Sequence, residues 1–309
     1  MNTTIVLDNF RDALSKNLTV VLCGLFILYV NSSLLRVYFT VPSFAHEARY
    51  VLYIFLVFND MVMVTLSVLL HVLSYQPRFI SVALCYILVF LSGTTYRNTP
   101  LILAGMAMER FVAVCLPLHH GRLCTASRAR RFNLIVWWAS SIPSLANIIL
   151  SLWERHASFY TSVILCYHVS LYPTAGQKVI TAAGSGIYMA FVWVTLVYTY
   201  THVLCTARAA SSNRGQIQKA QNTILLHAAQ LLLCMLSFVT PVIENIVLSM
   251  LPNLRNTVPF ANFLTTNLLP RILSPLIYGV RDKAFRKHMK GALLCQGRTQ
   301  STMIFNKRM

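Results

Sequence analysis

Catalysis and metal binding need titratable or nucleophilic side chains at defined spacings, and this sequence offers few such arrangements. Its nine histidines are scattered, and no pair at zinc-ligand spacing has a third ligand. No glycine-rich loop of the phosphate-binding kind is present. The adjacent His119 and His120 lie between apolar segments and are predicted to be solvated. These patterns predict a protein that is not an enzyme and that uses neither a metal nor a cofactor.

The unusual charges are those inside apolar segments. Asp60, Arg97 and Arg271 each lie within a long hydrophobic run, and Glu109 and Arg110 stand side by side near the end of another. An ionisable group surrounded by hydrocarbon is costly unless a partner offsets its desolvation. These residues are therefore candidates for ligand binding or for a conformational switch. Which of the two applies depends on where the predicted helices place them.

The composition is that of a membrane protein. Of the 309 residues, 56% are hydrophobic and 11% are charged, and the mean hydropathy is +0.61. Soluble domains carry about 25% charged residues. The net charge of +18 does not indicate nucleic-acid binding, because the basic residues occupy short gaps between apolar runs.

Seven apolar runs are each long enough to cross a bilayer as a helix, which takes about 20 residues. The sequence therefore predicts an all-α membrane protein, a seven-transmembrane helix bundle. The runs are Leu18–Val41, Tyr50–Ser74, Val82–Cys115, Phe132–Leu152, Val179–Arg208, Lys219–Met250 and Pro259–Val280.

The distribution of basic residues predicts the orientation of this bundle. With the N-terminus outside, 18 lysines and arginines fall on the inner side and six on the outer side. The positive-inside rule then places the C-terminus in the cytoplasm. Residues 1–17 become an extracellular segment and residues 18–281 the transmembrane domain. Asn2 and Asn17 begin glycosylation signals on the outer side, with Asn17 close to the bilayer.

Two of the eight cysteines lie clearly at the predicted outer face. Cys85 opens the third run, and Cys166 lies in the long outer loop before the fifth. An oxidising exterior favours a disulfide between them. The alternative is two free thiols.

The third run ends in the string "MAMERFVAVCLPLHH", residues 106–120. A lone arginine here would be an anchor reaching toward the headgroups, but that leaves the preceding acid unexplained. The string resembles the third span of rhodopsin-class G-protein-coupled receptors, and more closely that of olfactory receptors of the fish-type branch. The resemblance implies that Arg110 pairs with Glu109 at rest and is released toward the G protein on activation.

The resemblance covers essentially the whole chain. Asn31 in the first run and Asp60 in the second match polar residues of that receptor family, and the match implies a buried polar core. Tyr200 near the end of the fifth run matches the family's inward-facing tyrosine of the activation switch. The sixth run lacks a Trp-x-Pro element, as the olfactory branch does.

The seventh run ends in "SPLIYGVRDKAFRKHM". Pro275 and Tyr278 resemble an Asn-Pro-x-x-Tyr switch element, in which Ser274 replaces the asparagine. Residues 282–309 are expected to form a short amphipathic eighth helix and a cytoplasmic tail. Cys295 is a palmitoylation candidate, and an unmodified cysteine is the alternative.

A ligand pocket is expected in the outer half of the bundle. Aromatic side chains at such positions can equally serve helix packing. Arg97 is the distinctive member, and its hypothesised partner is an anionic ligand group such as a carboxylate. The alternative is a structural contact with a carbonyl or another side chain. The pocket candidates are Ser92, Gly93, Tyr96, Arg97, Tyr188, Phe238 and Glu244.

Asp60 and Arg271 are predicted to form a buried ion pair. Helical spacing places Arg271 on the same face as Ser274 and Tyr278, directed to the interior that holds Asp60. Pairing offsets much of the cost of two charges in a bilayer. The alternative is that Arg271 extends toward the cytoplasmic surface.

The function that follows from the resemblance is chemosensory. A small organic odorant would bind in the outer half of the bundle and favour a state that activates a G protein of the Gs or olfactory type. The expected location is the plasma membrane, with lipid as a further partner. Two alternatives stay open: a rhodopsin-class receptor for an internal ligand, and a membrane solute transporter.

Overall fold

The structure is a computed structural model of the whole chain. It describes residues 9–74, 80–164, 166, 171–210, 246–254 and 257–281, with isolated positions between 232 and 244 and at 287; the side chains of 74, 157, 207–210, 252 and 276–281 fall outside this description. Of the sixth predicted run, Lys219–Met250, only those isolated positions and the last residues are described. The predicted eighth helix lies almost entirely outside the described residues.

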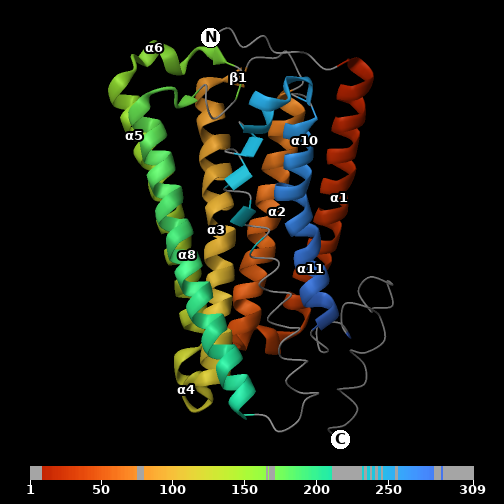
Figure 1. Cartoon of the computed structure of the whole chain (residues 1–309), viewed down its shortest axis with the longest axis vertical. Helices are drawn as coiled ribbons and strands as arrows, with labels where there is room; N and C mark the ends of the chain where they lie inside the picture. The colour runs from red at the N-terminus through yellow and green to blue at the C-terminus, as the bar shows by residue number, and fades with distance from the viewer. Residues whose placement is uncertain are drawn as a thin grey trace, which may run out of the picture.

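In the part of the chain that the structure describes, five long helices run side by side (Figure 1). Four of them, all but α3, are long and apolar enough to cross a membrane. α3 has the length, but Arg97 and its polar neighbours lower its hydropathy. The five are α1 (Phe10–Thr40), α2 (Ala48–Ser74), α3 (Val82–Cys115), α5 (Ala126–Glu154) and α8 (Ala175–Ala210).

Local signals account for where these helices begin. Ser81 Oγ caps α3 by accepting from the Leu84 amide at 3.4 Å, and Thr125 Oγ1 caps α5 by accepting from the Arg128 amide at 3.3 Å. α1 begins well before the predicted Leu18, and Asp12 in its first turn suits the positive end of the helix dipole. A polar start to a helix carries no hydropathy signal, which is why the predicted runs are shorter.

Short elements close the two ends of the bundle. At one end, β1 (Ile80–Ser81) pairs antiparallel with β2 (Val163–Ile164), next to α6 (Ala157–Tyr160). We call this the disulfide end. At the other, η1 (Pro42–His46) follows α1, and α4 (Pro117–Leu123) follows α3. We call this the α4 end. The chain continues through η2 (Pro252–Leu254), α10 (Val258–Asn262), the π-helical turn η3 (Phe263–Leu268) and α11 (Leu269–Arg281).

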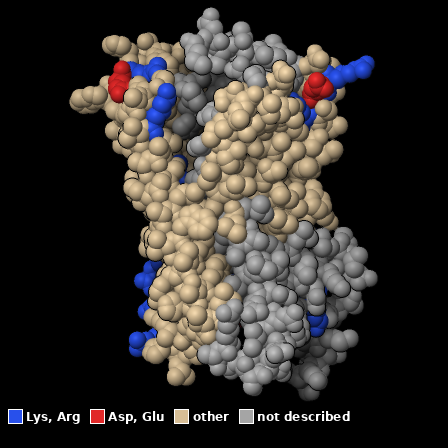
Figure 2. Space-filling model, viewed as in Figure 1, with Lys and Arg blue, Asp and Glu red and all other residues tan. Residues whose placement is uncertain are grey.

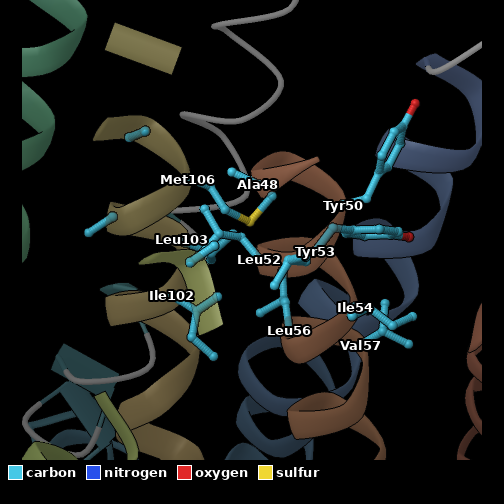
Figure 3. Close-up of a cluster of buried hydrophobic side chains, with 14 of the residues drawn as sticks. Ala48, Tyr50, Leu52, Tyr53, Ile54, Leu56, Val57, Ile102, Leu103 and Met106 are labelled. Carbon is cyan, nitrogen blue, oxygen red and sulfur yellow. The ribbon is translucent and has the colours of Figure 1, made fainter. Parts of the chain in front are cut away.

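α3 is the central helix, because it packs against α2, α5 and α8. Leu103 and Met106 of α3 point toward Leu52 of α2 within the largest buried cluster (Figure 3). On another side, a Cβ added at Gly105 would collide with the ring of Phe132. A glycine therefore lets α3 and α5 approach closely, as small residues do between membrane helices.

The outward faces of the bundle are apolar. Exposed side chains on α1, α5 and α8 include Phe26, Trp138 and Val194. On the face in Figure 2, the charged side chains gather toward the two ends and leave a broad uncharged band between. Such a band in water would promote association, whereas it suits contact with lipid.

Candidate functional site

The disulfide predicted from topology is present. Cys85 at the start of α3 is bonded to Cys166 in the loop after β2, with the two Cα atoms 5.5 Å apart. Tyr86 and Tyr172 pack beside it in a separate buried cluster, and the Tyr86 hydroxyl is hydrogen-bonded to Ser151 Oγ of α5. The loop is thereby fixed across this end of α3.

A polar core lies in the middle of the bundle, between α2 and α3. Asp60, only 2% exposed, accepts a hydrogen bond from Thr99 Oγ1 at 3.3 Å. Asn59 donates to the Thr95 carbonyl at 2.9 Å and to Thr99 Oγ1 at 3.0 Å, and Asn98 donates to Asn59 Oδ1 at 3.0 Å. Neither asparagine was predicted as a core residue, although each adjoins a charged residue that was predicted to be functional, Asp60 or Arg97.

Arg271 of α11 enters this core, as predicted. Its Nε lies 3.7 Å from Asp60 Oδ1, within ion-pair distance but beyond a hydrogen bond. Its Nη1 donates to the carbonyls of Thr266 and Asn267 at 2.8 and 3.0 Å, and its Nη2 lies 2.9 Å from Met63 Sδ. Arg271 is 2% exposed. The alternative, in which it extends toward the membrane surface, is therefore wrong.

Two further core residues carry polar atoms for which no partner is found among the described residues. Asn31 is buried in α1 with Nδ2 unbonded within that part of the chain. Ser274 stands where the resemblance implies an asparagine. It is also buried, and its Oγ has no hydrogen-bond partner among the described residues. Pro275 beside it is buried, and the side chain of Tyr278 lies outside the described residues.

Arg97 turns toward α5. Its Nε donates to the Ser140 carbonyl at 2.9 Å, and its Nη2 donates to Ser144 Oγ. A Cβ at Gly93 would lie 3.1 Å from Ser144 Oγ, so a glycine leaves room for this contact. Arg97 is 6% exposed. This is the structural contact that was predicted as the alternative to a contact with an anionic ligand.

Tyr188 of α8 also reaches α5, where its hydroxyl donates to the Ala139 carbonyl at 2.5 Å. Nearer the disulfide end, Asn147 donates to Thr181 Oγ1 at 2.8 Å. The buried serines and asparagine of α5 therefore form a polar seam with α3 and α8. No residue of the fourth run was predicted to line the pocket, although its polar residues recur at helical spacing and could have been a signal.

The remaining pocket candidates are only partly placed. Ser92 and Tyr96 are half-buried on α3. Glu244 accepts a hydrogen bond from Asn262 of α10 at 3.1 Å, which links the sixth and seventh runs. Phe238 lies outside the described residues.

At the α4 end, Glu109 is buried and bonded on both sides. Arg110 Nε lies 3.3 Å from its Oε2, and His120 Nε2 of α4 lies 3.1 Å from its Oε1. The local pairing of Glu109 with Arg110 is as the resemblance implied. The prediction that His120 is solvated holds only in part, because α4 turns this side chain toward α3 while leaving it 35% exposed.

The two tyrosines near the end of α8 differ in environment. Tyr200 packs half-buried against the main core, whereas Tyr198 is exposed and contacts the ring of Phe111 at a centroid distance of 5.6 Å. Tyr200 is thus the inward one, as expected.

The modification candidates are untested. Asn17 lies within α1. Asn2 and Cys295 lie outside the described residues.

Comparisons with known proteins identify the family of this chain. The sequence profile of the family described as 7 transmembrane receptor (rhodopsin family) matches residues 20–278. Odorant receptor 131-2 of Danio rerio is 30% identical over 282 residues, which cover 91% of this chain and 86% of that protein. Olfactory receptor 51L1 of Homo sapiens is 28% identical over 80% of this chain and 79% of that protein. Olfactory receptor 51F2 of Homo sapiens is 25% identical over 78% of this chain and 71% of that protein.

The profile covers most of the chain, and the match to a zebrafish protein confirms the predicted fish-type resemblance. Members of this family are multi-pass receptors of the plasma membrane rather than enzymes. The chain belongs to the rhodopsin family of seven-transmembrane receptors and, within it, to the odorant receptors.

Proposed function

We propose that this receptor binds a small organic odorant between the disulfide end and the polar core, and that binding activates a G protein of the Gs or olfactory type. The observation that carries the proposal is its likeness to Odorant receptor 131-2 along nearly the whole chain. The disulfide end faces the exterior, since disulfides persist in oxidising compartments. The α4 end faces the cytoplasm, because exposed basic residues lie at the end of α4 and the start of α5; these include Arg122, Arg128, Arg130 and Arg131. On the face in Figure 2, the charged side chains at this end are basic, whereas those at the other end are of both signs.

The ligand would contact half-buried side chains at the outer ends of the helices, with Ser92, Tyr96 and Tyr188 as the first candidates. The sixth of the seven spans would add Phe238 and Glu244. Arg97 would hold α5 against α3 rather than touch the ligand, because its described contacts are with α5. Binding would shift the receptor toward a state in which Arg110 leaves Glu109.

A cell-based screen tests this proposal. Cells expressing the receptor with the olfactory Gα subunit are exposed to amino acids, alkanoic acids, alcohols and amines, and cyclic AMP is measured against cells expressing the Arg110→Ala variant. A ligand-dependent rise that the variant lacks is expected. A response carried only through calcium-coupled G proteins would contradict the Gs assignment, and no response to any class would contradict the odorant assignment.

A further inference from the structure

Glu109 has a second nitrogen partner in addition to the adjacent arginine. Its Oε2 faces Arg110 Nε at 3.3 Å, and its Oε1 faces His120 Nε2 at 3.1 Å. The Glu109 side chain is 6% exposed, while that of Arg110 is 33% exposed. Each carboxylate oxygen therefore has its own protein partner, and water has little access to either.

The turn into α4 brings His120 to this position. Leu116 leaves the helical conformation after α3, and Pro117, whose ring suits the first position of a helix, begins α4. The Cys124 amide then donates to the His120 carbonyl at 2.8 Å and closes the helix. His119, one residue earlier, is exposed.

We propose that His120 is a positioning residue of the coupling switch, which keeps Glu109 hydrogen-bonded when Arg110 leaves it. This inference rests on the proposed G-protein coupling. Without a second donor, the departure of Arg110 would strand a buried carboxylate, which is far costlier than exchanging one partner of two. His120 Nε2–H can donate both from the charged imidazole and from the neutral tautomer protonated at Nε2. His120 therefore lowers the cost of releasing Arg110 and favours the coupled state.

The direction of this effect separates it from a contact that only stabilises the resting fold. A resting-state clasp would hold the pair together, and its loss would raise activity without ligand. A donor that bonds Glu109 after Arg110 has left has the opposite effect. Its loss lowers the activity measured without ligand.

The test measures ligand-free nucleotide exchange on purified Gs heterotrimer, catalysed by the full chain in lipid nanodiscs, relative to empty nanodiscs. The informative pair is His120→Asn and His120→Gln. The glutamine amide nitrogen can take the place of imidazole Nε2, whereas asparagine is one methylene too short. His119→Asn is the matched control on the exposed neighbour.

We expect His120→Asn to lower basal exchange about tenfold, equivalent to about 1.4 kcal/mol. His120→Gln and His119→Asn should stay close to wild type. In a Glu109→Gln background, His120→Asn should have no further effect, because a neutral amide does not need the second donor.

Three results would overturn the inference: a rise in basal exchange on His120→Asn, a fall of equal size in the Glu109→Gln background, or a shared loss in the asparagine and glutamine variants. If the wild-type receptor catalyses no exchange at all, the proposed coupling to Gs fails and the inference fails with it. If the wild-type receptor catalyses exchange but the variants do not follow the expected order, the role of His120 is refuted and the proposed coupling to Gs stands.

Discussion

Exchanging the charges of Asp60 and Arg271 probes the polar core most directly. Asp60→Arg alone places two arginines together, and Arg271→Asp alone places two acids together. Both single variants should lose surface expression and thermal stability. The double variant restores an opposite pair in reversed order, and it should recover part of both.

The structure sets the size of the effect. At the 3.7 Å between Arg271 Nε and Asp60 Oδ1, two unit charges attract by about 4 kcal/mol at an effective dielectric constant of about 20. Breaking a buried pair by removing one partner costs about 3–5 kcal/mol. Arg271→Asp also removes the bonds to the Thr266 and Asn267 carbonyls, so it should be the more damaging single change.

The assay is the unfolding temperature of detergent-purified receptor together with surface expression, and the coupling between the two sites comes from the double-mutant cycle. The exposed pair Arg49–Glu47, at 2.7 Å, is the matched control. Exchanging that pair should change little, because surface ion pairs contribute about 0–1 kcal/mol. A double variant no more stable than the worse single would refute the pair. A clear dependence of wild-type stability on sodium would refute it too, because it would show that a sodium ion, and not Arg271, balances the charge of Asp60.

Three further predictions concern other parts of the receptor. Cys85→Ser and Cys166→Ser should each reduce surface expression, and the double variant should be little worse than either, whereas additive losses would show that the cysteines act separately. Arg97→Gln should lower the unfolding temperature by freeing α5 from α3 while leaving the relative potencies of acidic and neutral odorants unchanged; a selective loss of acidic odorants would instead place Arg97 in the ligand site. Burial and then the Glu109 carboxylate raise the pKa of the Cys124 thiol, so alkylation of Cys124 should need a higher pH than that of an ordinary cysteine. Peptide mapping should show that alkylation of Cys124 is faster in the Glu109→Gln variant. An unchanged rate would contradict the effect of the Glu109 carboxylate on this thiol.

The sequence allowed those features to be predicted that depend on hydropathy and helical period. The ends of α3 at Val82 and Cys115 were both predicted correctly, because an apolar run meets polar or turn-forming residues at each end. The meeting of Asp60 and Arg271 was also predictable. Both are charged and set in apolar runs, and the helical period directs Arg271 inward.

Features that depend on how neighbouring helices rotate could not be predicted in the same way. Arg97 donates to a backbone carbonyl of α5, and a carbonyl has no sequence signal. The contact of His120 with Glu109 depends on the angle at which α4 leaves α3, which Leu116 and Pro117 set locally. The early start of α1 was missed because a helix can extend into water without an apolar pattern.

The most direct test of the proposed function is whether agonist binding depends on the nucleotide state of a G protein. Agonist affinity would be measured for receptor in nanodiscs with Gs heterotrimer, first without nucleotide and then with a non-hydrolysable GTP analogue. Coupling between the two binding sites is reciprocal. A receptor that activates Gs must therefore bind agonist more tightly with nucleotide-free Gs and lose that gain when the analogue is added. Equal affinity under both conditions would contradict coupling to Gs.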